Sequence, residues 1–152
     1  MADRTESSIV IAADPGRVMA VIADIASYPE WSDGVKSVEI LAEYEDGRPA
    51  DARFVVDAGA IKDTYELEYD WDDDVSVSWK LTQGQMMKAL DGSYELSDNG
   101  DGTTTVVYKL AVDVSIPMIG LIKRKAEKVI VDTALRGLKE RVEGGSSSDD
   151  ES

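Results

Sequence analysis

Cysteine and histidine are both absent from the 152 residues of this chain. Without cysteine, the chain cannot form a disulfide, a thiolate metal site or a thiol nucleophile. Without histidine, it lacks the commonest general base near neutral pH and cannot build a Ser-His triad. Acid–base chemistry would have to depend on Asp, Glu, Tyr or Lys. We also expect no metal ion and no cofactor.

Positive charge is scarce: 16 Lys and Arg residues stand against 31 Asp and Glu, a formal net charge of −15. Nucleic acids and anionic lipid surfaces are bound through Lys and Arg, so we expect neither as a partner. No stretch approaches the roughly 20 apolar residues of a membrane-spanning helix, so we expect no membrane insertion. The polar start MADRTESS is unlike a signal peptide. We predict a cytoplasmic protein and leave its oligomeric state open.

The composition is that of a globular domain, with 43% hydrophobic and 31% charged residues. The length suits one domain with one core. At the end of the chain, the segment GGSSSDDES is small, polar and acidic. We therefore predict a single domain over residues 1–143 and a disordered acidic tail over residues 144–152.

The first part of the chain predicts a strand followed by two short helices. Residues 7–12 are typical of a strand, and Asp14 is placed to cap the helix that follows. The apolar stripe of that helix has a helical spacing and comprises Val18, Val21, Ile22 and Ile25. Ser27 and Glu30 have the spacing of a capping box, which favours a second short helix ending at Trp31.

From residue 35 to residue 114 the hydrophobic period changes to two, which predicts strands. The expected strands lie around residues 35–44, 51–57, 61–71, 75–82, 90–96 and 106–112. Turn signals such as Asp46-Gly47 separate them. Short turns imply antiparallel neighbours, and a single apolar face implies a sheet that is covered on one side.

Residues 117–143 predict a long helix that begins at Pro117 and stops at Gly144. Such a helix would be roughly 40 Å long, enough to cross the sheet. Its expected apolar stripe is Ile119, Ile122, Ala126, Val129, Ile130, Thr133, Leu138 and Val142. We predict an α+β fold in which a strongly curved seven-stranded antiparallel sheet wraps around this C-terminal helix, with two short helices between strands 1 and 2.

Several segments in this order carry a family resemblance: residues 8–11, 14–18, 23–31, 75–79, 90–96 and 100–106. With the terminal helix, they resemble the START / Bet v 1-like (SRPBCC) superfamily and its polyketide cyclase/dehydrase and lipid-transport family. The resemblance covers about residues 5–142. It implies a helix-grip fold with an elongated cavity between sheet and long helix, in which members hold hydrophobic molecules such as lipids, polyketides and quinones.

Inward-facing positions of the predicted elements are the candidates for the wall of this cavity. From the sheet and the second short helix they are Trp31, Phe54, Tyr65, Leu67, Tyr69, Trp79, Tyr94 and Tyr108. From the long helix they are Ile122, Ala126, Ile130 and Thr133. Met86 and Met87 follow a glycine-containing break and suit an adaptable mouth. The helix also carries small residues on or beside its expected apolar stripe, namely Ala126, Thr133, Ala134 and Gly137. Small side chains there would leave empty volume between the helix and the sheet.

Three functions stay open. The first is binding or transport of a hydrophobic small molecule, a lipid, a polyketide or a quinone-like compound. The second is a polyketide aromatase/cyclase or dehydratase, with Tyr65 and Tyr69 as candidate catalytic residues. Members of that group are thought to use a cavity tyrosine and arginine, whose places here fall near Val35 and Glu68. The third is a protein-interaction module with a vestigial cavity.

Two charged features have a plain structural interpretation. Asp63 shares a face with Tyr65 but adjoins a turn, so we expect it at the solvated rim of the sheet. The basic triplet of residues 123–125 spans most of the circumference of the helix, which is typical of a solvated helix face.

Overall fold

The computed structural model describes residues 5–32, 34–57, 62–114 and 120–151, with side-chain detail for all of these but 114, 120–123 and 145–151. In chain order the elements are β1 (Thr5–Ile11), α1 (Pro15–Ala23), η1 (Ile25–Ser27), α2 (Tyr28–Trp31), β2 (Val35–Glu43), β3 (Pro49–Asp57), β4 (Lys62–Asp72), β5 (Ser76–Gly84), β6 (Met87–Asp98), β7 (Thr104–Val114) and α3 (Gly120–Glu151). This is the predicted order of a strand, short helices, six strands and a long helix.

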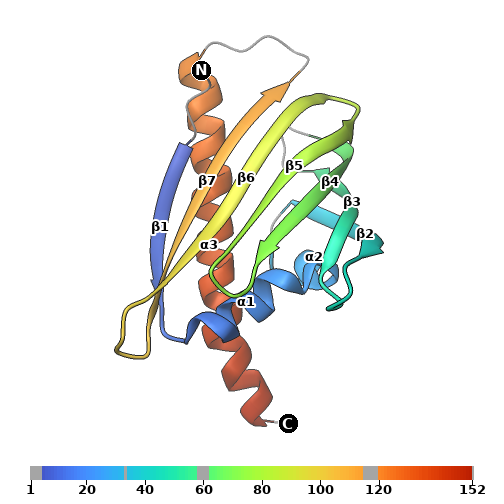
Figure 1. Ribbon diagram of the computed structural model, residues 1–152. Helices are drawn as coiled ribbons and strands as arrows, with labels where there is room; N and C mark the ends of the chain where they lie inside the picture. The colour runs from blue at the N-terminus through green and yellow to red at the C-terminus, as the bar shows by residue number, and fades with distance from the viewer. Residues whose placement is uncertain (1–4, 33, 58–61, 115–119, 152) are drawn as a thin grey trace.

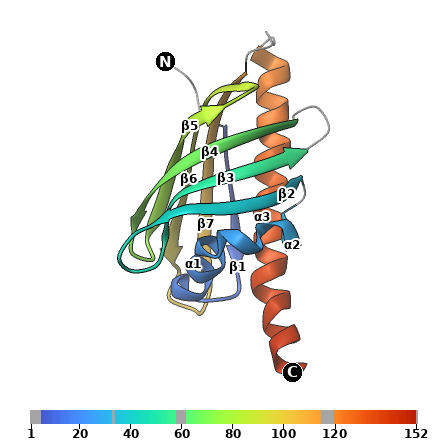
Figure 2. The same ribbon diagram turned by 90° about the vertical axis from the view of Figure 1, so that its right-hand side faces the viewer.

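The described strands form one seven-stranded antiparallel sheet in the order β1-β7-β6-β5-β4-β3-β2. Strands that pair are consecutive in the chain except β1 and β7, whose pairing includes Ile9 opposite Val106. Gly47 and Gly100 adopt φ of 87° and 82° in the tight turns, a region that favours glycine. The sheet is strongly curved, and α3 runs along its concave side (Figures 1 and 2). The predicted fold class is therefore confirmed.

Of the two short helices between β1 and β2, the first has the cap that we expected and the second does not. The Asp14 carboxylate accepts the backbone N–H of Arg17 at 2.8 Å, which confirms the predicted N-cap of α1. The predicted capping box is wrong, because the Ser27 side chain makes no capping hydrogen bond and the 3-10 turn η1 leads directly into α2. Instead, the Tyr28 hydroxyl donates to the Ile22 carbonyl at 2.6 Å and ties α2 back to α1.

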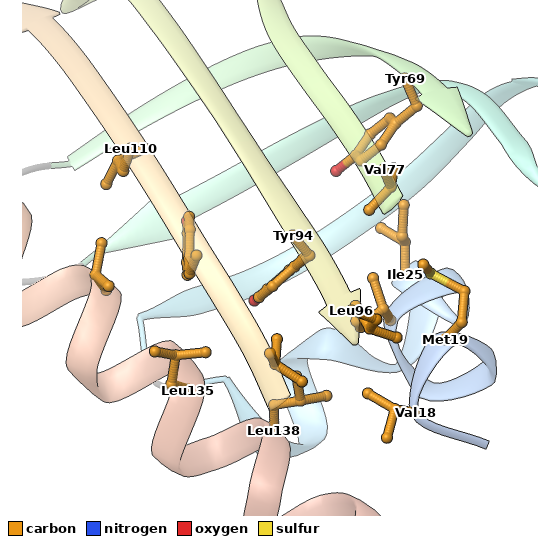
Figure 3. Close-up of a cluster of buried hydrophobic side chains, with 14 of the residues drawn as sticks. Val18, Met19, Ile25, Tyr69, Val77, Tyr94, Leu96, Leu110, Leu135 and Leu138 are labelled. Carbon is orange, nitrogen blue, oxygen red and sulfur yellow. The ribbon is translucent and has the colours of Figure 1, made fainter. Parts of the chain in front are cut away.

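The centre of the core is aliphatic and lies between α1, the sheet and the C-terminal half of α3 (Figure 3). Fully buried members include Val18, Met19, Ile22, Ile25, Val77, Val106, Leu135 and Leu138. Burying a side chain of this size contributes about 1.5–3 kcal/mol relative to leaving it in water. This cluster fixes α1 and α3 against the sheet.

The buried stripe of α3 agrees with the predicted one at Leu138 and Val142 and differs from it elsewhere. Its buried residues follow one another at helical spacing and are Val131, Leu135, Leu138 and Val142. Val129, which we expected in the stripe, is 60% exposed, and Ala126 and Ile130 are half-buried. The helix carries a second apolar flank beside the buried one, and periodicity alone does not show which flank turns inward.

Polar contacts hold α3 against the edge of the sheet at two levels. The buried Glu127 carboxylate accepts the Thr5 hydroxyl at 2.7 Å and the Val112 backbone N–H at 2.8 Å. Further along the helix, Lys139 Nζ donates to the Val10 carbonyl at 2.9 Å. These bonds set the position of the helix relative to β1 and β7. In the described part of the chain, no helix is both long and apolar enough to cross a membrane.

Helix α3 continues to Glu151, beyond the Gly144 at which we expected it to stop. Glycine costs about 1 kcal/mol inside a helix but does not by itself end one. The predicted start at Pro117 lies outside the described residues. The domain boundary at residue 143 and the disorder of residues 144–152 stay predictions.

Candidate ligand-binding cavity

A cavity of about 480 Å3 lies between the concave face of the sheet, α2 and α3. Its described wall is mostly apolar and aromatic. Sheet residues of the wall are Val35, Phe54, Val56, Asp57, Tyr65, Tyr69, Trp79, Met87, Leu90, Tyr94, Tyr108, Leu110 and Val112. Residues of α2 and the following loop are Tyr28, Trp31, Ser32 and Gly34, and those of α3 are Val129, Ile130, Thr133 and Ala134.

Four aromatic rings on adjacent strands form the central part of the sheet wall. Strand pairing sets Tyr69 opposite Trp79, and Tyr94 opposite Tyr108. The ring centroids are 5.9 Å apart in the first pair and 4.7 Å in the second, and Trp79 lies 5.3 Å from Tyr94. A Cβ at Gly92, the residue of β6 opposite Trp79, would overlap the indole ring. Glycine at this position therefore lets the indole lie against the strand.

A second aromatic group lines the cavity near α2. Tyr28 and Trp31 meet edge to face at 5.0 Å, and Phe54 stacks on Tyr65 at 5.5 Å. On α3, Gly137 leaves room for Trp31, because a Cβ there would lie 3.0 Å from the Trp31 carbonyl oxygen. The buried Trp31 Nε1 has no hydrogen-bond partner in the described part of the chain.

Tyrosine hydroxyls are the main polar groups of the sheet wall. Burial raises the pKa of four of them well above the ordinary value for tyrosine: Tyr65, Tyr69, Tyr94 and Tyr108. For the first three, nearby tyrosines raise the pKa further. Each hydroxyl therefore stays neutral at physiological pH and can both donate and accept a hydrogen bond. Tyr94 projects from β6 toward α3 (Figure 3).

Asp63 is buried rather than solvated, which corrects our expectation for this residue. Its Oδ2 accepts the backbone N–H groups of Met86 and Met87 at 3.1 and 2.9 Å, and its Oδ1 accepts that of Gln85 at 3.1 Å. The turn between β5 and β6 folds over the start of β4 and uses the carboxylate as its acceptor. Asp63 therefore shapes the end of the sheet that presents Met87 to the cavity.

Most of the predicted wall residues lie where we placed them. Those that line the cavity are Trp31, Phe54, Tyr65, Tyr69, Trp79, Met87, Tyr94, Tyr108, Ile130 and Thr133. Leu67 is buried in the core, while Met86 and Ala126 are half-buried away from the wall. Ile122 lies outside the residues with described side chains. That the predicted wall residues bind a ligand stays a prediction.

Sequence reasoning missed other wall residues. Leu110 and Val112 continue the inward face that contains Tyr108, so the period of two could have found them. Ala134 was noted only for its small size. Tyr28 and Val35 carry no such signal, because their place in the wall depends on how α2 packs on α3 and β2.

A curved antiparallel sheet that holds a long C-terminal helix across a cavity defines a START / Bet v 1-like helix-grip protein. The family described as polyketide cyclase / dehydrase and lipid transport matches residues 2–143, and the chain belongs to this family. No curated protein sequence matches the chain.

Solved structures with the same fold cover nearly the whole chain. A START superfamily protein from Mycobacterium smegmatis has a TM-score of 0.87 at 22% identity, covering 93% of this chain and 98% of that one. A protein from Thermus thermophilus has a TM-score of 0.79 at 26% identity, covering 94% and 99%. The Zhui aromatase/cyclase from Streptomyces sp. R1128 has a TM-score of 0.77 at 16% identity, covering 94% of both chains. The resemblance drawn from the sequence is confirmed at the level of family and fold.

Proposed function

We propose that this protein binds and carries a hydrophobic small molecule, such as a lipid, a polyketide or a quinone-like compound, in the cavity between the sheet and α3. The observation that carries the proposal is the cavity itself, about 480 Å3 in volume and walled mainly by apolar and aromatic side chains. Binding sites for drug-sized molecules have volumes of about 300–1,000 Å3 and the same kind of lining.

Small side chains on α3 support a cavity that is kept open. Thr133 and Ala134 face the sheet across the cavity, where larger side chains would fill it. A module that only contacts other proteins would gain stability from a filled core, since empty apolar volume destabilises a fold. The open cavity therefore favours ligand binding over a vestigial site.

The aromatase/cyclase alternative has less support. Its candidate catalytic residues, Tyr65 and Tyr69, both line the cavity. Burial raises the pKa of both hydroxyls, so neither is a competent base near neutral pH. The likeness to the Streptomyces aromatase/cyclase concerns the fold at 16% identity. We therefore prefer a carrier to an enzyme.

A first experiment asks whether the protein holds a guest. Native mass spectrometry of protein freshly isolated from its own cells should show a bound apolar compound that is released on denaturation. In parallel, titration with the neutral naphthyl ketone prodan should give a blue shift and a rise in emission, since the dye moves from water to an apolar site. An extract of apolar cell compounds should displace it.

A pair of variants localises the binding. Ala134→Trp adds an indole inside the cavity and should weaken prodan binding at least about tenfold, a loss of roughly 1.4 kcal/mol. Ala20→Trp places the same ring on an exposed position of α1 and should leave binding unchanged. Equal binding by both variants, with circular dichroism like that of the wild type, would show that the dye binds elsewhere and would count against the proposal.

We further propose a cytoplasmic location with no nucleic-acid partner. The net charge of −15 supports the absence of a nucleic-acid partner, because nucleic acids repel such a protein. Filter binding to duplex DNA and to RNA at low salt should show no retention.

A further inference from the structure

The described wall of the cavity contains one charged side chain, Asp57, and no lysine or arginine. Asp57 lies at the end of β3, with its carboxylate 3.8 Å from Lys62 Nζ. Of the basic helix triplet, Arg124 and Lys125 are exposed and do not line the cavity. Within the described wall, an ionised carboxylate or phosphate would lose its water without gaining a positive partner, which is unfavourable.

The cavity nevertheless offers hydrogen-bond donors. Among the described residues, no protein group accepts a hydrogen bond from the hydroxyls of Tyr94 and Tyr108, nor from those of Tyr65 and Tyr69. Tyr28 differs, since its hydroxyl is satisfied by the Ile22 carbonyl. These tyrosines line the cavity, so their hydroxyls can donate to a guest that supplies an acceptor.

Tyr94 and Tyr108 are the best placed of these donors. They lie directly opposite each other on β6 and β7, with ring centroids 4.7 Å apart. Trp79 contacts both rings, at 5.3 Å and 5.7 Å, and so limits their movement. Across the cavity lie the small residues Thr133 and Ala134 of α3, where a guest has room.

We propose, resting on the function proposed above, that Tyr94 and Tyr108 anchor an uncharged carbonyl or hydroxyl oxygen of the guest and that the cavity rejects the ionised carboxylate of a free fatty acid or other organic acid. The pair selects neutral oxygen-bearing molecules, such as ketones, esters and alcohols. The rings of Tyr69 and Trp79 supply flat apolar surface for the rest of the guest.

The test compares two probes of one skeleton by equilibrium dialysis at neutral pH with the full chain. Prodan carries a neutral ketone, and the naphthoic acid with the same ring and dimethylamino group carries an ionised carboxylate in its place. We expect the acid to bind at least about tenfold more weakly than prodan. The methyl ester of the acid should bind like prodan, because it restores a neutral acceptor to the same skeleton.

Variants then test the two hydroxyls. Tyr94→Phe and Tyr108→Phe should each weaken prodan binding by about threefold to tenfold, as expected for the loss of one neutral hydrogen bond. Neither should change the binding of the parent dimethylaminonaphthalene, which has no oxygen. Tyr44→Phe is the matched control, since that hydroxyl lies outside the cavity and donates to the Tyr69 carbonyl.

The outcomes separate this inference from the function on which it rests. If none of the probes binds, the proposed function fails and this inference fails with it. If prodan and the acid bind equally, the cavity binds guests but does not select by charge, and the inference alone is overturned. Unchanged prodan binding by both tyrosine variants would likewise overturn the assigned anchor.

Discussion

The carboxylate of Asp63 on β4 accepts the backbone N–H of Met87, 24 residues further along the chain, at 2.9 Å. Two more N–H groups of the same turn share this carboxylate. A buried side chain thereby supplies the acceptor for these N–H groups, at the end of the sheet where Met87 lines the cavity.

Asp63→Ala should lower the free energy of unfolding by about 1–3 kcal/mol, because it leaves buried N–H donors without an acceptor. Asp63→Asn should cost less, since the amide oxygen still accepts from the turn. Urea denaturation followed by circular dichroism measures both. The control Asp70→Ala removes an exposed carboxylate of the same strand and should change stability by less than about 0.5 kcal/mol. Equal midpoints for the Asp63→Ala variant and the wild type would contradict the assigned role.

The burial of Asp63 marks a limit of reasoning from the sequence. Alternation along β4 correctly set this residue on the inward face with Tyr65. The adjoining turn suggested a solvated rim, yet the residues that bury it come from the β5–β6 turn, which is remote in sequence. Periodicity reports the face of a strand on which a residue lies, not what packs over that face.

The same limit explains why the sequence did not predict the volume of the cavity or the full orientation of the long helix. Turn signals and the period of two were enough to predict the succession of strands along the chain, and Asp14 was enough to predict the start of α1. The rotation of α3 was predicted only in part: Leu138 and Val142 are buried as expected, but the apolar pattern did not separate the buried Val131 from the exposed Val129. The volume of the cavity depends on sheet curvature, which no local pattern reports.

The cavity tyrosines predict a steep loss of stability in alkali. Burial raises their pKa in the folded protein, as for Tyr94 and Tyr108. Above the unfolded value of about 10, the unfolded chain loses these protons while the folded protein keeps them, so rising pH favours unfolding. The stabilising contribution is complete below that pH and falls as the pH rises above it.

Tyrosinate absorbance and far-ultraviolet circular dichroism, recorded together during an alkaline titration, check this expectation. The tyrosinate signal of the buried residues should appear only with the loss of ellipticity. The same titration in concentrated urea should instead give a gradual curve near the ordinary tyrosine pKa. Ionisation of all the tyrosines in a chain that keeps its ellipticity would refute the burial of these hydroxyls.

Gly92→Ala should destabilise the protein by about 1–3 kcal/mol, the usual cost of forcing extra volume into a packed site. The new methyl group would overlap the indole of Trp79 and push it into the cavity. Prodan binding should therefore weaken together with thermal stability, and near-ultraviolet circular dichroism should report the displaced ring.

Ser93→Ala is the control at the next position of the same strand. The Ser93 hydroxyl is buried without a hydrogen-bond partner among the described residues, so its removal should leave stability unchanged or slightly higher. Should Gly92→Ala match Ser93→Ala in melting temperature, the close contact between Gly92 and Trp79 would not exist in solution.

Gly137→Ala tests the contact between α3 and α2. The added Cβ would lie 3.0 Å from the Trp31 carbonyl oxygen and 3.3 Å from ring atom Cε3, so Trp31, which packs on Tyr28, must give way slightly. Gly144→Ala is matched to it, since both glycines lie in α3 but nothing described surrounds Gly144 within 4 Å. Each change gains up to about 1 kcal/mol of helix propensity. The difference between the unfolding free energies of the two variants, measured in urea, therefore isolates the contact with Trp31. We expect Gly137→Ala to be the less stable and to bind prodan several-fold more weakly, because the part of the cavity wall that α2 supplies is displaced. Identical stability and identical binding in the two variants would mean that α2 does not rest on Gly137.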